Sequence, residues 1–411
     1  MIFETTIAGM IVFTGVIMAL VLILNFAGNK LLPQGEVNIL INEDNDSVLK
    51  TKPGDTLLSV LSNQNLYLPS ACGGQGTCAL CKCQVIDGGG DILPTETAYI
   101  SRSEVKNNWR LACQVKIKND MEIKIPDEVF SIKKWDCTVV SNNSVATFIK
   151  ELILDLPQGD NLDFKAGGYI QIDIPEYSSL KYSDFEVQTK YHPDWDKYKI
   201  WDLIANNDES IFRAYSMANH PAEGNRIMLN VRIATPPPKL WNDVAPGIAS
   251  SYIYGLKPSD KVTISGPYGE FFIKDTQKEM IYIGGGAGMA PMRSHLFHLF
   301  HTLKTSRKVS FWYGARSKRE MFYDEEFKKI SKKFPNFNYN VALSEPLPED
   351  KWDGPTGFIH QVVNDKYLSY HEDPNELEFY MCGPPPMITA CENMLFDLGV
   401  EEDQIAYDVF G

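Results

Sequence analysis

Four of the eight cysteines of this chain fall within one stretch, from Cys72 to Cys83. Eight cysteines in 411 residues are too few for a disulfide scaffold. Cys72, Cys78 and Cys81 have the spacing C-x5-C-x2-C, and Cys113 follows 32 residues later in RLACQV. Thiolates are soft ligands for transition metals. The clustering therefore predicts a metal centre, and such a centre fixes how the surrounding chain must fold.

The cysteine spacing resembles that of plant-type ferredoxins, which hold a [2Fe–2S] cluster with C-x4-C-x2-C and a distant fourth cysteine. The loop here is one residue longer, and its three glycines let backbone amides turn toward the sulfurs. We predict a [2Fe–2S] cluster, with a four-cysteine zinc site as the alternative. Cys83 is either a spare thiol or a substitute ligand.

The composition is that of an ordinary globular protein, with 44% apolar and 22% charged residues. Its length predicts two to four domains. The net charge of −14, from 39 basic and 53 acidic residues, argues against nucleic acid as a main partner.

The run Ile7–Ala27 contains 21 residues without a charged side chain. As a helix it would be about 31 Å long, enough to span a bilayer core. The acidic start MIFETT and the poor cleavage site in NFAGNKLLP favour a retained anchor over a signal peptide. A buried soluble helix is the alternative. The positive-inside rule, resting on Lys30, places the rest of the chain in the cytoplasm.

Hydrophobic patterning predicts an α+β multidomain protein with one transmembrane helix. Two segments alternate like half-buried strands, VNILIN and MEIKI. Four later segments resemble the strands of an antiparallel β-barrel: TVVS, YIQIDI, RIMLNVRIA and KVTIS. A strand–glycine loop–helix repeat then indicates a doubly wound parallel sheet. We predict an anchor and linker over 1–35, a β-grasp ferredoxin domain over 36–129, a flavin barrel over 130–275 and a nucleotide domain over 276–411.

Three segments of the predicted barrel resemble the flavin site of the ferredoxin–NADP reductase superfamily. They are Arg213-Ala214-Tyr215-Ser216, the G-x-x-S segment Gly247–Ser250, and Gly266-Pro267-Tyr268-Gly269-Glu270-Phe271. The resemblance implies that Arg213 pairs with the FAD diphosphate, that Tyr215 stacks on the flavin ring and that Ser216 lies near its N5. Gly247 and Ser250 would hold the diphosphate at a helix N-terminus.

The segment IYIGGGAGMAP resembles the nucleotide loop of the same superfamily, with Pro291 where G-x-G-x-x-G has its third glycine. Gly285, Gly286 and Gly288 would then shape the diphosphate site, and Pro291 is expected to open an amphipathic helix at its first position. In C-G-P, Cys382 and Gly383 would lie beside the nicotinamide, although a structural cysteine is the alternative. Near the C-terminus, Phe410 either covers the flavin or belongs to the core.

Two features of the nucleotide and flavin regions leave alternatives open. Arg316, Lys318 and Arg319 follow the second strand of the predicted sheet and are suited to a 2′-phosphate, whereas Glu320 is the one acidic candidate for a ribose. About 44 residues, rich in aromatic and charged side chains, separate Tyr169 from Arg213. They form either a self-packed excursion or a docking surface for a partner.

The order of the segments, and phrases such as RAYSMAN, LNVRIATPPP and WYGARSKREMFY, resemble the F subunits of bacterial sodium-translocating NADH:quinone oxidoreductases over essentially the full chain. The resemblance implies NADH, FAD and a 2Fe-2S cluster held by Cys72, Cys78, Cys81 and Cys113.

It also implies a reaction and a location. NADH would give hydride to FAD, with Ser216 and Cys382 as the catalytic positions. Electrons would pass singly through the cluster to other membrane subunits and finally to quinone. The chain would be a single-pass protein of the bacterial inner membrane with its soluble domains in the cytoplasm. The alternatives are a membrane-anchored reductase that serves an oxygenase, and a tethered ferredoxin whose other domains are an interaction scaffold.

Overall fold

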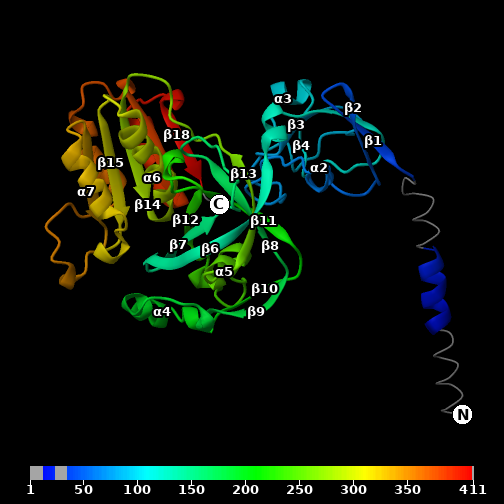
Figure 1. The fold of residues 1–411 in the computed structure, drawn as a ribbon, viewed down its shortest axis with the longest axis horizontal. Coiled ribbons are helices and arrows are strands. Elements are labelled where there is room, and N and C mark those ends of the chain that lie inside the picture. The colour runs from blue at the N-terminus through cyan, green and yellow to red at the C-terminus, as the bar shows by residue number, and fades with distance from the viewer. Residues whose placement is uncertain (1–12, 24–34, 410–411) are drawn as a thin grey trace, which may run out of the picture. The chain divides into compact units, whose positions relative to one another are not determined.

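The computed structural model describes residues 13–23 and 35–409 (Figure 1). It divides into two units, Met1–Ser70 with Gly74–Ser131, and Ala71–Gly73 with Ile132–Gly411. Residues 13–23 are helical and exposed, and the rest of the predicted span 7–27 lies outside the described residues. Within the described ranges, no helix is both long and apolar enough to cross a membrane.

The first unit is a five-stranded sheet with a short helix packed on it. The strands are β1 (Val37–Ile41), β2 (Asp44–Thr51), β3 (Lys82–Asp87), β4 (Trp109–Leu111) and β5 (Met121–Lys124), in the order β2-β1-β5-β3-β4. β1 and β5 are parallel, whereas the other pairs are antiparallel. This mixed sheet is the arrangement expected of a β-grasp domain.

The helix α2 (Leu57–Asn63) begins where the sequence predicts. The Thr56 hydroxyl accepts a hydrogen bond from the Ser59 amide at 3.2 Å and so caps the helix. Leu57, Leu58 and Leu61 are buried, as their helical spacing requires. A second short helix, α3 (Arg102–Lys106), starts in a capping box.

The second unit begins with an antiparallel barrel. Its strands are β6 (Lys133–Ala146), β7 (Ile149–Asp155), β8 (Tyr169–Ile174), β11 (Ile211–Ser216), β12 (Arg226–Arg232) and β13 (Lys261–Tyr268), in the order β11-β8-β13-β6-β7-β12. A bridge between Met217 and Leu229 joins the two end strands. Inward-facing aliphatic side chains fill the interior, because side chains alternate across each strand.

The residues between β8 and β11, 175–210, form an inserted segment with its own small core. It contains the two-stranded sheet β9 (Tyr177–Lys181) and β10 (Ile204–Asn207) and the helix α4 (His192–Lys197) (Figure 1). Tyr182 and Trp195 are fully buried, and Trp195 donates its indole hydrogen to the Thr147 carbonyl at 2.8 Å. These aromatic side chains pack inward, as the self-packed interpretation expects.

The rest of the second unit is built on a five-stranded parallel sheet. The strands are β14 (Glu279–Gly285), β15 (Val309–Ala315), β16 (Phe337–Leu343), β17 (Leu377–Gly383) and β18 (Ile405–Val409), in the order β16-β15-β14-β17-β18. Helices α6 (Met289–Phe297), α7 (Asp324–Lys333), α8 (Ile359–Lys366) and α9 (Pro385–Asp397) connect them. Separate hydrophobic clusters cover the two faces, as in the predicted doubly wound fold.

Candidate functional site

The strand order of the parallel sheet reverses between β14 and β17, and ligands of such sheets bind at this point. Gly284 on β14 lies opposite Cys382 on β17. Residues 286–288 form a tight turn in which Gly286 has φ +58°. A Cβ on Gly288 would lie 2.1 Å from the Cys382 carbonyl oxygen, so only glycine fits there. The loop thus brings backbone amides and a helix N-terminus to the switch point, as a diphosphate requires.

Two expectations about the following helix are wrong. α6 begins at Met289, so Pro291 is its third residue rather than its first, because the turn ending at Gly288 leads directly into helical geometry. Pro291 is still in the first turn, whose amides lack partners within the helix. The helix is also buried on every side rather than amphipathic, since it packs between β14 and β17 of the sheet and β12 of the barrel.

Both predicted catalytic residues, Ser216 and Cys382, lie next to Asp408. The Ser216 hydroxyl, at the end of β11, donates to Asp408 Oδ2 at 2.7 Å. Asp408 lies on β18 directly opposite Cys382 on β17. Burial raises the pKa of the Cys382 thiol well above its ordinary value, and the nearby Asp408 adds to this effect. The barrel and the sheet therefore share one site.

Asp408 is a residue of this candidate site that the sequence reasoning missed. Burial raises the pKa of its carboxyl group, and the hydrogen bond from Ser216 opposes that shift. The signal was an acidic residue in the C-terminal segment YDVFG, two positions before the aromatic Phe410. Phe410 itself lies outside the described residues.

The predicted flavin motif lies on β11 of the barrel. Arg213 and Tyr215 are half-buried on the same side of β11, because they are two residues apart in a strand. The Arg213 guanidinium donates to the Phe212 carbonyl at 2.7 Å. Burial raises the pKa of the Tyr215 hydroxyl.

The second flavin segment forms the start of helix α5 (Ile248–Gly255). Among the described residues, no side chain caps this helix end, and Gly247 occupies the cap position. A Cβ on Gly247 would lie 2.6 Å from the Cβ of Ala234. The Ser250 hydroxyl accepts from the Ala234 amide at 3.0 Å and donates to the Gly247 carbonyl, so it shapes the loop. An uncapped helix N-terminus fits an anionic diphosphate.

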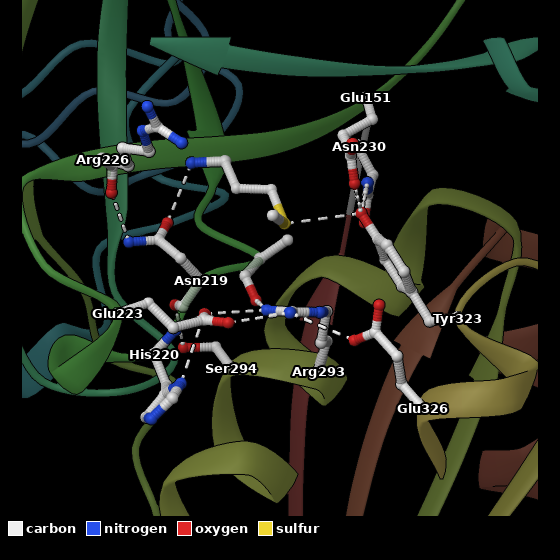
Figure 2. A network of polar contacts seen from close by, with 12 residues as sticks. Glu151, Asn219, His220, Glu223, Arg226, Asn230, Arg293, Ser294, Tyr323 and Glu326 are labelled. Carbon is white, nitrogen blue, oxygen red and sulfur yellow. Dashed lines mark hydrogen bonds and ion pairs between the residues drawn. The ribbon is translucent and has the colours of Figure 1, made fainter. Parts of the chain in front are cut away.

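A buried ion pair joins the nucleotide loop's helix to the barrel (Figure 2). Arg293 on α6 is 4% exposed and donates to both carboxylate oxygens of Glu223 at 2.8 Å and to the Ala218 carbonyl at 2.9 Å. Glu326 on α7 lies 3.2 Å from the same guanidinium. The pair holds the segment after Ser216 against the helix that follows the glycine loop.

Further polar contacts extend this connection (Figure 2). The Ser294 hydroxyl donates to the Asn219 carbonyl at 2.8 Å. The Tyr323 hydroxyl accepts from the Asn230 amide at 2.8 Å and donates to the Glu151 carboxylate. Because bidentate and buried contacts allow few alternative geometries, the barrel and the sheet are held in one relative position.

In the first unit, two of the predicted cluster ligands, Cys81 and Cys113, are in contact, and Cys78 lies nearby. The Cys81 and Cys113 side chains are hydrogen-bonding neighbours, which raises the pKa of the Cys81 thiol, and burial and the nearby Cys78 add to this. Gly74, Gly76 and the non-glycine Ala79 have positive φ, so the loop holds a strained, sharply turning backbone. In the described ranges, no three His, Cys, Asp or Glu side chains are arranged as ligands of one metal ion.

None of the four predicted cluster ligands forms a disulfide in the described part of the chain. Soft donors on a loop with turned backbone amides fit a [2Fe–2S] cluster. Gln114 adds a side-chain donor, since its Nε2 lies 3.6 Å from Cys113 Sγ. Cys83 is buried in β3 opposite Arg110, and burial raises the pKa of its thiol to about 12.

Three protein-family models match the chain. The 2Fe-2S iron-sulfur cluster binding domain matches residues 41–118, the oxidoreductase FAD-binding domain matches 199–273, and the oxidoreductase NAD-binding domain matches 282–393. The chain therefore carries domains for a 2Fe-2S cluster, FAD and NAD in the predicted order.

Two of the solved structures that resemble this fold are reductases. A cytochrome P450 reductase of Amycolatopsis, GcoB, is 23% identical with a TM-score of 0.62, covering 91% of this chain and 98% of its own. The ferredoxin reductase of carbazole 1,9a-dioxygenase is 24% identical with a TM-score of 0.59, covering 92% of this chain and 99% of its own. At these identities the likeness shows the fold alone.

Much more similar relatives share one name, that of the F subunit of a Na(+)-translocating NADH-quinone reductase. The protein of Idiomarina loihiensis is 56% identical over 98% of both chains. That of Neisseria meningitidis serogroup C is 55% identical over 98% of this chain and 99% of its own, and that of Haemophilus ducreyi is 54% identical over 98% of both. At this identity over nearly the whole length, the chain belongs to the family of F subunits of Na+-translocating NADH-quinone reductases.

Proposed function

We propose that this chain is the electron-input subunit of a sodium-pumping respiratory complex. It oxidises NADH by hydride transfer to FAD and passes electrons through a 2Fe-2S cluster to other membrane subunits, from which they reach quinone. The shared name of its relatives and its three matched domains support this function. The observation that carries the proposal is the meeting of Ser216, Asp408 and Cys382, which joins flavin motif and nucleotide sheet.

When bound, FAD supplies the chemistry of taking two electrons as hydride and releasing them singly to the iron–sulfur cluster. The chain's own residues bind and orient the reactants. The missing Cβ of Gly288 lets the loop approach the β17 backbone, and the open space at Gly286 is where the NADH diphosphate would lie at the start of α6. Arg213 pairs with the FAD diphosphate, and Tyr215 provides a flat ring against which the flavin can stack.

At the meeting point, Ser216 would orient the flavin edge and Cys382 would border the nicotinamide. Cys382 is fully buried and Ser216 nearly so, and such burial would help to exclude water from the reaction. Asp408 holds Ser216 by accepting its hydroxyl hydrogen, and burial raises the pKa of this carboxyl group. The Arg293–Glu223 pair holds the barrel against α6, and this would fix the flavin and nicotinamide sites relative to each other.

In the first domain, Cys72, Cys78, Cys81 and Cys113 would hold the cluster. We place the domain boundaries as predicted, at 35, 129 and 275, with the matched family regions lying inside them. Residues 7–27 would form a single-pass anchor in the bacterial inner membrane, with the remaining domains in the cytoplasm where NADH is available. The absence of charge between Glu4 and Lys30, and the helical conformation of residues 13–23, support the anchor.

NADH-driven quinone reduction in native membrane vesicles tests this function. We expect vesicles from a strain lacking the gene to lose the sodium-stimulated rate, and a plasmid copy to restore it. A Ser216→Ala copy should restore assembly but only a slow rate. An unchanged rate in the deletion strain would refute the electron-input role and would favour the oxygenase-reductase alternative.

A further inference from the structure

The loop that follows the second strand of the nucleotide sheet carries three basic residues, Arg316, Lys318 and Arg319. In doubly wound folds, the adenosine ribose lies at the end of this strand, and an arginine there accommodates the 2′-phosphate of NADPH. The sequence alone therefore favours NADPH as readily as NADH. The contacts of Arg316 and Arg319 in the structure favour NADH over NADPH.

Arg319 is engaged by the inserted segment. Its Nη2 lies 3.1 Å from Asp194 Oδ2, and its Nη1 donates to the Lys190 carbonyl at 3.3 Å. The two side chains of the pair are 28% and 12% exposed, so the contact is partly shielded from water. A guanidinium held by a carboxylate and a carbonyl must break both contacts before it can turn to a phosphate.

Arg316 is engaged by an acid of its own loop. Its Nη2 lies 3.4 Å from Glu320 Oε1. Glu320 is held in turn by Thr147 in the turn between β6 and β7, whose backbone amide donates to Oε2 at 3.0 Å and whose hydroxyl donates to Oε1. Both oxygens of the one acidic ribose candidate thus accept hydrogen bonds from the protein.

The inserted segment also contacts Thr147, the residue that holds Glu320 of this loop. Trp195, one residue after Asp194, is fully buried and donates to the Thr147 carbonyl at 2.8 Å. The same threonine therefore connects α4 to Glu320. Lys318 stays exposed, and a lone ammonium lacks the two-pronged geometry with which guanidinium groups bind phosphate.

We propose that the inserted segment 175–210 is a nucleotide-selectivity element, in which Asp194 withholds Arg319 from the 2′-phosphate of NADPH and so favours NADH. This inference rests on the proposed function and names the substrate discrimination of the same site. It assigns to the segment a role in the nucleotide domain, although the segment is an insertion in the flavin barrel.

The test is the variant Asp194→Asn in the full-length chain within the assembled complex. Releasing the guanidinium adds a charge-assisted hydrogen bond to a 2′-phosphate, so we expect the preference for NADH over NADPH, as a ratio of kcat/KM, to fall about tenfold. Binding of 2′,5′-ADP, measured by calorimetry, should tighten by a similar factor, whereas binding of 5′-AMP should not tighten. Asp208→Asn removes the same charge from an exposed position of the segment and should change neither quantity.

The double variant Asp194→Asn/Arg319→Gln separates release of the arginine from general loosening of the loop. We expect it to return to the selectivity of the unmodified chain. If the gain in 2′,5′-ADP binding persists without Arg319, or if Asp194→Asn retains its FAD and its tryptophan fluorescence yet binds 2′,5′-ADP no more tightly, the inference is overturned.

If the Asp194→Asn protein does not fold, the single variant Arg319→Gln provides the alternative test. Since the arginine is withheld, Arg319→Gln should not weaken binding of 2′,5′-ADP, and weakened binding would also overturn the inference. Failure of the proposed function would look different, because the unmodified complex would then transfer no electrons from either nucleotide.

Discussion

Replacing Gly288 with alanine tests whether the close approach between the glycine loop and β17 sets the hydride-transfer geometry. The added Cβ would lie 2.1 Å from the Cys382 carbonyl oxygen and 2.6 Å from the Gly383 amide nitrogen. Ordinary contacts between such atoms are about 3.5 Å, so the two backbones must separate by about 1 Å or more. A displacement of about 1 Å between reacting groups costs on the order of 100-fold in rate. We therefore expect flavin reduction by NADH to slow about 100-fold.

The assay is anaerobic stopped-flow measurement of flavin bleaching after mixing with NADH. Gly399→Ala is the matched control, because Gly399 follows α9 outside the glycine loop and has φ +75° and no atom within 4 Å of its Cβ position. That substitution should cost about 1 kcal/mol of stability through backbone strain, without separating the two strands. If Gly288→Ala reduces its flavin at nearly the unmodified rate, or if Gly399→Ala slows it equally, the geometric reasoning is refuted.

Three further predictions concern buried polar groups. Arg293→Met should destabilise the second unit by about 2–3 kcal/mol in denaturant unfolding, because it removes the charge-assisted hydrogen bonds to Glu223, whose side chain is 27% exposed. Glu326→Gln, at a side chain 42% exposed, should cost less than about 1 kcal/mol. Burial raises the pKa of Asp408, so ionisation of this side chain opposes folding at neutral pH. The Asp408→Asn protein should therefore unfold at a higher temperature than the unmodified protein at pH 7. This gain in unfolding temperature should disappear below the ordinary aspartate pKa of about 4, where Asp408 is protonated in both the folded and the unfolded state. Gln114→Leu should lower the midpoint potential of the cluster by about 40 mV in an EPR-monitored titration. This shift is equivalent to losing one hydrogen bond of about 1 kcal/mol to Cys113 Sγ. An unchanged potential would count against that hydrogen bond.

The likeness to oxygenase reductases illustrates how little a shared fold decides about a partner. GcoB and the carbazole dioxygenase reductase cover more than nine-tenths of this chain, yet they are only 23% and 24% identical to it. A shared fold does not decide which partner a protein serves, since a partner contacts surface residues rather than the shared architecture. The relatives at 54–56% identity are the ones that identify the family.

Local sequence patterns predicted the elements well because their causes are local. The alternation in YIQIDI corresponds to β8, and the leucines after Thr56 correspond to α2. The start of α6 was misplaced because proline tolerates any position in the first helical turn, and the preceding glycines decide where that turn begins. Its burial on all sides was missed because the second covering surface comes from the barrel, far away in the sequence.

The sequence by itself determined which cofactor domains this protein has and in what order, since cysteine spacing and glycine loops encode ligand geometry within a few residues. Only the tertiary structure decided which distant side chains complete those sites. Ser216 and Asp408 are 192 positions apart, and Asp194 reaches Arg319 from an insertion in another domain. Such pairs have no periodicity or spacing to detect, because strand order and the packing of barrel against sheet bring them together.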